Sequence, residues 1–393
     1  MRYCVIILDG AAGWPLPAYG GRTSLQVAAT PNLDRLCREG AVGLAQTVPQ
    51  GAEPSSSAAC TSILGYDPVA DYVGRGAIEA ASMGIRLAPD EVAMRVNLVS
   101  IENGVMASYA AGHIPTADSR ELVGEIAAAL DDDTFRLYPG IAYRHILVVR
   151  GHKELLEGAY VPPHDISDQV VAEYLPCGAG TGILLDYMER ARPIIAGSEI
   201  TSRRAAAVVA PTDVWPFWPG EAPASITPFA ERYGVSAAMT SGVDLLNGLA
   251  VLFGIERLEI DGVTDGPDTD YAAQALGALE ALDTHDVVVV HVESPDEAGH
   301  AGDAEGKIAA IEAIDREVVA RIAGSAEDLR ILAMPDHPTP IEIKTHVGEA
   351  VPFVLHGPGV ERAIADGFDE SGAGGTGLIV DPGHGVMGML LGR

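Results

Sequence analysis

Short apolar runs alternate along this chain with longer stretches in which apolar residues recur every three or four positions. Residues 3–8 (YCVIIL), 286–292 (DVVVVHV) and 329–334 (LRILAM) are aliphatic runs typical of strands buried on both faces of a sheet. Between the last two, residues 307–323 predict a helix from apolar residues at helical spacing: Ile308, Ile311, Ile314, Val318 and Ile322. Strands that alternate with helices in this way predict an α/β fold with a doubly wound, mixed or parallel sheet.

A second helix is predicted over residues 30–40 (TPNLDRLCREG). We expect Thr30 as its N-cap, Pro31 in its first turn and Gly40 as its stop, because these residue types favour those positions.

The middle of the chain follows a different pattern, with alternating apolar and polar positions and frequent glycine and proline turns. Residues 92–98 (VAMRVNL) and 143–149 (YRHILVV) predict strands of this kind. We therefore expect residues 1–66 and 206–393 to form a core domain, into which residues 67–205 insert as a smaller α+β domain.

The acidic composition of the chain excludes some classes of binding partner. With 55 acidic against 25 basic residues, the net charge is −30. Such a surface repels nucleic-acid phosphates and anionic membranes, so neither is expected as a partner. No apolar run approaches the roughly 20 residues of a membrane span, and no signal peptide is predicted. The cysteines form no CxxC pair, which is typical of reduced thiols: Cys4, Cys37, Cys60 and Cys177. We expect a cytoplasmic protein.

Carboxylates and imidazoles follow the predicted strands where those strands end. Six are candidate metal ligands: Asp9, Asp296, His300, Asp336, His337 and His346. Asp296 and His300 are four residues apart, so they would share one face of a helix, and His346 could complete a three-ligand set. A single Asp after a strand is more often a helix N-cap than a ligand. The conjunction at three strand ends instead favours two divalent ions, Mn²⁺, Zn²⁺ or Mg²⁺, without an organic cofactor.

Three consecutive serines offer a candidate nucleophile. Ser55, Ser56 and Ser57 precede a stretch of small residues that can start a helix. A serine at a helix N-terminus lies among unpaired N–H groups and the positive end of the dipole, which favours an alkoxide and a bound phosphate. A serine-rich N-cap explains the same pattern, and spacing does not choose among the three.

The middle domain contributes basic residues that could bind an anionic substrate by bidentate pairing: Arg75, Arg95, Arg144, His145 and His164. Taken one at a time, each is also explained as a solvated or structurally paired side chain.

These residues lie in segments that resemble the archaeal-type, cofactor-independent (2,3-bisphosphoglycerate-independent) phosphoglycerate mutases of the alkaline phosphatase superfamily. The similarity runs in order along nearly the whole chain. It is carried by LDG at 8–10, ATPNLDRL at 29–36, ILGYDP at 63–68, YVGRGAIEA at 72–80, YRHILVV at 143–149, PPHDI at 162–166, HVESPDEAGHAGD at 291–303 and PDHPTP at 335–340. It implies an alkaline-phosphatase-like core with an inserted lid domain.

The resemblance also implies roles. One metal would be bound by Asp296, His300 and His346, and the other by Asp9, Asp336, His337 and the nucleophilic serine. Position relative to the segment at 63–68 implies that this serine is Ser56. In the implied mechanism Ser56 takes the substrate's phosphoryl group and returns it to a different hydroxyl, while the lid retains the substrate and excludes water.

The chain departs from the family's pattern close to the implied nucleophile and substrate. Ser55 stands where the family has Gly, Ser57 where it has Asp, and Cys60 where it has His. Gln274, a further substrate-binding candidate, replaces a lysine that helps to hold the phosphoryl group, and Asp213 replaces a small or polar residue. The resemblance therefore implies metal-dependent phosphoryl transfer more strongly than it implies the substrate.

The leading hypothesis is a two-metal phosphotransferase that interconverts 3-phosphoglycerate and 2-phosphoglycerate. One alternative is a divergent member that acts on another small anionic substrate, similar to a homoserine kinase or to a phosphonate or carboxylate biosynthetic enzyme. A second alternative is a non-catalytic metal-binding homologue, against which the intact ligand set argues. The sequence leaves the oligomeric state open.

Overall fold

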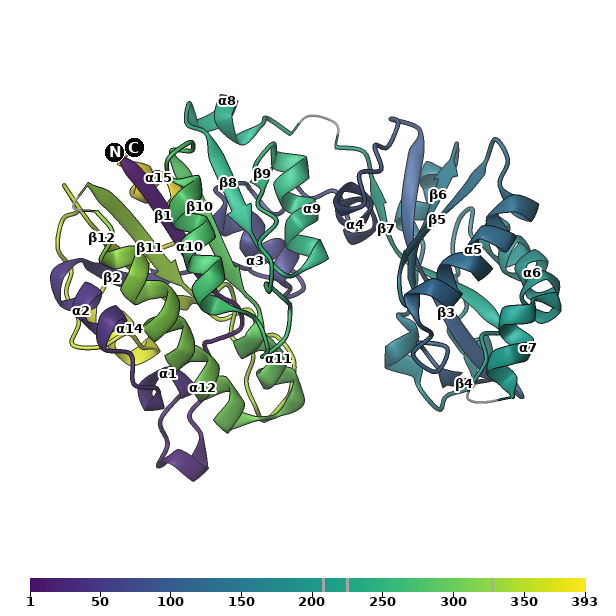
Figure 1. Ribbon diagram of the computed structural model, residues 1–393, viewed down its shortest axis with the longest axis horizontal. Coiled ribbons are helices and arrows are strands. Elements are labelled where there is room, and N and C mark those ends of the chain that lie inside the picture. Colours follow the sequence, from purple (N-terminus) through teal and green to yellow (C-terminus); the bar gives the residue numbers. More distant parts are fainter. Residues whose placement is uncertain (207–208, 224–225, 327) are drawn as a thin grey trace. The chain divides into compact units, whose positions relative to one another are not determined.

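The computed structural model of the protein describes residues 1–206, 209–223, 226–326 and 328–393. These residues form two compact units (Figure 1). The first unit comprises Met1–Tyr72 and Ile226–Arg393, and the second comprises Val73–Ser225. None of the helices within the described ranges is both long enough and apolar enough to cross a membrane.

The first unit is built on an eight-stranded sheet with the order β13-β2-β12-β11-β1-β10-β8-β9. Its strands are β1 (Arg2–Leu8), β2 (Ala41–Ala45), β8 (Ala237–Thr240), β9 (Glu256–Arg257), β10 (Val287–Val292), β11 (Leu329–Met334), β12 (Val351–His356) and β13 (Ile379–Val380). Strand β1 pairs in parallel with β10 and with β11, and β10 pairs in parallel with β8, whereas β12 is antiparallel to both of its neighbours. The α/β fold and the three strands predicted from apolar runs are confirmed.

Helices cover both faces of this sheet, as Figure 1 shows for α10 and α12 in front of it and α3 and α15 behind it. The helices are α1 (Ser24–Val27), α2 (Pro31–Glu39), α3 (Ser56–Ile63), α8 (Phe229–Tyr233), α9 (Asp244–Phe253), α10 (Tyr271–Ala281), α11 (Ser294–Ala301), α12 (Ala304–Ala313), α13 (Ala320–Ala323), α14 (Glu370–Thr376) and α15 (Gly385–Leu391). A π-helical segment, η5 (Ile314–Val319), joins α12 to α13, and a short 3₁₀ turn, η1, spans Pro17–Tyr19. The predicted helix at 307–323 is therefore present, with a widened turn in its middle.

The second unit has a five-stranded antiparallel sheet with helices packed against it. Its strands are β3 (Glu91–Glu102), β4 (Val105–Ser108), β5 (Phe135–Ile141), β6 (Arg144–Arg150) and β7 (Asp213–Glu221). Its helices are α4 (Arg75–Ser82), α5 (Thr116–Leu130), α6 (Gly182–Gly197) and α7 (Glu199–Ala205), with 3₁₀ turns η2 (Lys153–Glu157), η3 (Pro163–Ile166) and η4 (Val171–Glu173). Apolar residues of β3, β6, α5 and α6 form its own core, which includes Met94, Leu122, Leu147 and Tyr187.

The boundaries of this unit differ from the predicted ones. Residues 206–225 were expected in the core domain, yet β7 pairs along β3 from Val92 to Val99 and so completes the second unit's sheet. The alternating pattern of β7 is interrupted by Pro216 and Pro219, which hides the strand from a reading of the sequence alone.

Helix α2 begins with a cap that the sequence did not predict. Thr30 precedes the helix as expected, but its side chain makes no capping hydrogen bond. Asp315, from the π-helical segment, accepts instead from Leu33 N at 2.7 Å, from Asn32 N at 3.2 Å and from Asn32 Nδ2 at 2.9 Å. A buried carboxylate nearly 300 residues away thus satisfies the first N–H groups of α2.

Replacing this carboxylate should therefore cost more than replacing the local threonine. Asp315→Ala is expected to lower the free energy of unfolding by about 2 kcal/mol, because it leaves buried N–H groups without an acceptor. The matched Thr30→Ala variant should lose about 1 kcal/mol or less. Guanidinium denaturation of the two variants measures the difference, and equal losses would contradict the assignment of the cap.

Candidate active site and metal centre

The carboxyl ends of the parallel strands bring the site together at one edge of the first unit's sheet. Leu8, the last residue of β1, pairs with Val292 of β10, and Ile7 pairs with Met334 of β11. Asp9, Glu293 and the Asp336–His337 pair therefore leave the sheet side by side. This edge is where open α/β sheets bind their ligands.

Asp296 lies at the centre of the first candidate metal group. One ligand atom from each of Asp296, His337 and His346 lies within 4.8 Å of the other two. His300 Nε2 is 3.1 Å from Asp296 Oδ2 and 2.9 Å from His346 Nε2, so the predicted Asp296–His300–His346 set is also in contact. Thr339 donates its hydroxyl to Asp296 Oδ1, which orients the carboxylate.

Asp336 anchors the second candidate group, which contains Asp9, Asp336 and His337. Asp336 Oδ1 accepts from Gly10 N at 3.0 Å and from His337 N at 2.7 Å. Its Oδ2 lies 3.2 Å from His337 Nε2, which is 3.7 Å from Asp9 Oδ1. All three side chains are fully buried, and His337 belongs to both groups.

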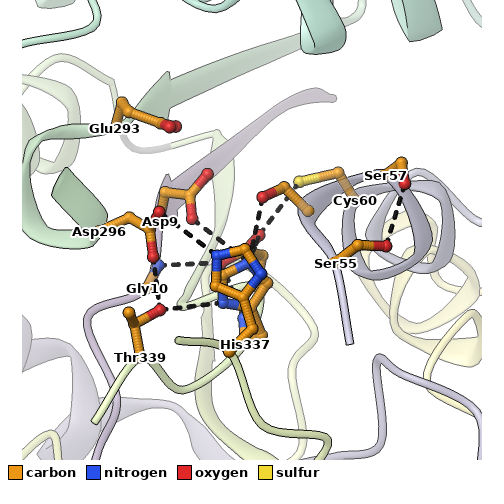
Figure 2. Close-up of polar contacts among 12 residues, drawn as sticks. Asp9, Gly10, Ser55, Ser57, Cys60, Glu293, Asp296, His337 and Thr339 are labelled. Carbon is orange, nitrogen blue, oxygen red and sulfur yellow. Dashed lines mark hydrogen bonds and ion pairs between the residues drawn. The ribbon is translucent and has the colours of Figure 1, made fainter. Parts of the chain in front are cut away.

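A glycine is required where the first strand turns into this site. Gly10 has a positive φ of 59°, and a Cβ at this position would collide with Asp296 and Thr339. Figure 2 shows Gly10 next to the side chains of Asp296 and Thr339. The LDG segment thus combines a candidate ligand, Asp9, with a glycine that leaves room for the carboxylate of Asp296.

Of the three serines, Ser56 is the one that contacts the group. Its Oγ lies 3.1 Å from His337 Nε2, at the first position of α3. Ser55 is the N-cap and accepts from Ala58 N, while its Oγ lies 3.0 Å from that of Ser57 (Figure 2). The structure thereby separates a capping serine from a serine that faces the candidate ligands.

Burial and mutual repulsion dominate the electrostatics of the site. Burial, followed by the charges of Asp336 and Asp296, raises the pKa of Asp9 well above its ordinary value. Burial also disfavours ionised Asp296, but hydrogen bonds from His300 and His346 outweigh it and hold the pKa of Asp296 well below its usual range. The bond to Asp296 raises the pKa of His300 to about 9. A divalent cation among these carboxylates would offset their repulsion.

A third group contains two residues that the sequence analysis did not select. Asp9, His291 and Glu293 have ligand atoms within 4.8 Å of one another. His291 lies inside β10, where every other residue is valine, and that exception was the available signal. Glu293 lies at the end of the same strand; burial and the nearby charge of Asp9 raise the pKa of its carboxyl well above normal.

Two of the five predicted basic residues of the second unit, Arg75 and Arg95, share the carboxylate of Glu79. Arg75 Nε donates to Glu79 at 2.9 Å, and Arg95 forms an ion pair with the same carboxylate. The guanidinium of Arg75 lies 3.8 Å from the ring centroid of Trp218, and the His164 ring lies 5.7 Å from the same residue. Arg144, by contrast, lies over Tyr143 at 5.8 Å.

Three of the expected substrate residues are buried: Arg95 is 7% exposed, and His145 and Gln274 are almost completely enclosed. His145 accepts from Gly140 N at its Nδ1, and Gln274 donates to the backbone oxygen of His291 at 2.8 Å. Each is only 1% exposed. Contact with a substrate would require an exposure that this conformation does not give them, so their role in binding stays a prediction.

The other positions that depart from the family's pattern have mainly structural partners. Asp213, in the second unit, forms an ion pair with Arg192. Cys60 is the exception, because its thiol points at Oδ2 of Asp336 from 3.7 Å and so borders the candidate metal group (Figure 2).

Comparisons with known proteins place these residues in context. Residues 37–201 match the model of the family described as 2,3-bisphosphoglycerate-independent phosphoglycerate mutase. A probable 2,3-bisphosphoglycerate-independent phosphoglycerate mutase from Geobacter sulfurreducens is 43% identical over 402 residues, covering 100% of both chains. The enzyme of that name from Methanothrix thermoacetophila is 44% identical over 386 residues, covering 96% of this chain and 97% of its own.

Solved structures agree with these matches. A Pyrococcus horikoshii protein superposes with a TM-score of 0.85 at 28% identity, covering 100% of this chain and 97% of its own. The cofactor-independent phosphoglycerate mutase from Thermoplasma acidophilum superposes with a TM-score of 0.68 at 27% identity, covering 100% and 99%.

The burial of His145 should make the free energy of unfolding depend on pH. Burial, with the charges of Arg95 and Arg120, lowers the pKa of His145 from 6.5 to about 3. Between these values the unfolded chain binds a proton that the folded chain does not, so stability falls as the pH falls.

His145→Asn keeps an acceptor near Gly140 N but cannot titrate. The wild-type protein should therefore lose about 2 kcal/mol of unfolding free energy relative to this variant between pH 7 and pH 5. Denaturation at both pH values measures this, and a difference between the two proteins that does not change with pH would contradict it.

Proposed function

We propose that this chain, which belongs to the 2,3-bisphosphoglycerate-independent phosphoglycerate mutase family, interconverts 3-phosphoglycerate and 2-phosphoglycerate through a phosphoserine intermediate on Ser56. The observation that carries the proposal is the 3.1 Å contact between Ser56 Oγ and His337 Nε2, which joins a helix-terminal hydroxyl to the cluster of candidate ligands. Relatives that are similar over the whole chain bear the name of this activity.

The cluster fits two divalent cations. Buried Asp9 Oδ1 has no hydrogen-bond partner among the described residues, and imidazoles are mixed with carboxylates in both groups. This donor set suits Mn²⁺ or Zn²⁺ better than Mg²⁺. We assign one ion to Asp296, His300 and His346, and the other to Asp9, Ser56, Asp336 and His337. When bound, such ions would stabilise negative charge on the attacking and leaving oxygens.

Ser56 carries the covalent step. Its Oγ forms a bond to phosphorus as the bond between phosphorus and the substrate oxygen breaks, and the substrate hydroxyl regains the proton that Ser56 gives up. The reverse exchange, on the neighbouring hydroxyl of the same glycerate, completes the isomerisation and restores Ser56. The N-terminal position on α3 supports the phosphorylated serine, because backbone N–H groups and the helix dipole favour an anion there.

The basic group of the second unit is suited to bind the anionic substrate. Glu79 orients Arg75 and Arg95, and its single negative charge leaves the three together with a net positive charge. Arg144 and His164 lie on neighbouring elements of the same unit. We assign these four basic residues to recognition of the phosphoglycerate, because cationic side chains of this kind pair with carboxylates and phosphates.

The metal assignment predicts that removing ligands of one site lowers the number of ions bound per chain. Purified protein should bind about two Mn²⁺ or Zn²⁺ per chain by elemental analysis. The double variant Asp336→Ala, His337→Ala should bind at most one, because one ligand set loses two members. His285→Ala, Asp286→Ala removes a matched imidazole–carboxylate pair before β10 and should keep both ions; full metal content in the first variant would contradict the assignment.

The nucleophile and the substrate are tested together. Metal-loaded protein should convert 3-phosphoglycerate in an assay coupled to enolase. Ser56→Ala should lower turnover at least about ten-thousandfold, as removal of other covalent nucleophiles does. Ser55→Ala should cost the α3 cap, about 1 kcal/mol of stability, while keeping turnover.

Two outcomes of this assay would contradict the proposed nucleophile or the proposed substrate. Undiminished turnover in Ser56→Ala would place the nucleophile elsewhere. Absence of turnover in the metal-loaded wild-type protein would favour the alternative of a different phosphorylated acid or amino alcohol. The feature that favours a different substrate is Cys60, which lies beside Asp336 and therefore close to the proposed site of phosphoryl transfer.

A further inference from the structure

Three buried side chains form a hydrogen-bonded line that ends on a candidate metal ligand. Ser241, directly after β8, has its Oγ 3.0 Å from His291 Nδ1, and His291 Nε2 lies 2.6 Å from Asp9 Oδ2. His291 and Asp9 are fully buried, and Ser241 is nearly so. The line thus crosses the sheet from β8 through β10 to the end of β1.

The direction of these hydrogen bonds is set by the charge that Asp9 carries when it binds a cation. Val243 N donates to Ser241 Oγ at 3.0 Å, which leaves the hydroxyl proton of Ser241 for His291 Nδ1. A neutral imidazole donates at one nitrogen and accepts at the other. Asp9 binds a cation as an ionised carboxylate, which can only accept, so in the metal-bound protein Nε2 carries the ring proton and donates it to Asp9 Oδ2.

The imidazole is also held through its backbone. Gln274 donates its amide to the backbone oxygen of His291, and Asp9 N donates to Val292 O at 3.0 Å. Both the donor and the acceptor of the short contact are thus fixed to paired strands. With Oδ2 occupied in this way, Oδ1 of Asp9 is left without a hydrogen-bond partner among the described residues and lies 3.7 Å from His337 Nε2.

The same residues could instead bind a third ion together with Glu293, but the contact is too short for that. Two ligand atoms that each lie about 2.1 Å from one cation, at right angles, are about 3 Å apart. The 2.6 Å separation of His291 Nε2 and Asp9 Oδ2 is that of a charge-assisted hydrogen bond.

We propose that His291 is a positioning residue, which holds Asp9 so that Oδ1 faces the metal bound by Asp336 and His337. The inference rests on the proposed metal site and adds to it a residue outside the ligand set. Hydrogen-bonded supports of this kind typically change metal affinity by about 10–100-fold when they are removed. The effect should fall on one of the two ions only, because Asp296, His300 and His346 lie outside the line.

Titration of metal-free protein with Mn²⁺, followed by calorimetry, tests this. His291→Leu should weaken one binding step about 10–100-fold and leave the other unchanged. His291→Gln offers an amide donor near the position of Nε2 and should recover part of that affinity. His285→Leu, which removes an imidazole just before β10 that contacts Glu256, is the matched control and should bind as the wild type does.

Ser241→Ala removes the outer link and leaves the imidazole in place, so it remains informative if His291→Leu fails to fold. We expect Ser241→Ala to lower the metal affinity of the same binding step about threefold, a smaller loss than His291→Leu causes. Wild-type affinity in both Ser241→Ala and a folded His291→Leu would overturn the positioning role. So would a wild-type stoichiometry of three ions that falls to two in His291→Leu, because His291 would then be a ligand. A wild-type protein that binds no ion would instead overturn the metal site itself, and the positioning role with it.

Discussion

The parallel pairing of β1 with β10 on one side and β11 on the other is the constraint on which the site depends. The pairing sets Leu8 beside Val292 and Ile7 beside Met334, so the residues that follow these strands leave the sheet together. Carboxylates that are more than 280 positions apart in the chain then share one small volume. The chemistry of the site is thus a consequence of strand register, and a shift of one residue would turn these side chains to the opposite face.

The site also gathers several negative charges in a buried place, and three of its carboxylates are each stabilised by their own hydrogen bonds. Asp336 accepts from two backbone N–H groups, Asp296 accepts from Thr339, and Asp9 is hydrogen-bonded to His291. Each bond fixes one oxygen and lowers the cost of burying it. The repulsion that remains among the carboxylates is what a pair of divalent cations is suited to offset.

Much of this arrangement could be predicted from the sequence, and the failures have physical causes. The buried strands were recognisable as aliphatic runs, and Asp296 and His300 as a helical pair, because both signals are local. Helix α2 takes its cap from Asp315, a distant contact that no local pattern encodes. Spacing alone left the choice among Ser55, Ser56 and Ser57 open; the resemblance implied Ser56, which is the serine that contacts His337. His291 differs from the valines around it, but its partner Asp9 follows β1 and lies 282 positions away in the chain, a contact that no local pattern encodes.

Strand β7 comes late in the chain, and this determines where the second unit can be cut out as a separate protein. Strand β3 is flanked by β6 and β7, and β7 lies more than 110 residues after the start of β3. A fragment cut where the alternating pattern of the sequence stops, near residue 205, would leave Val92–Val99 as an unpaired strand edge. Such an edge pairs with other chains, so the fragment would be prone to self-association through strand addition. The sheet of this unit is complete only when its last strand, β7, is kept with it.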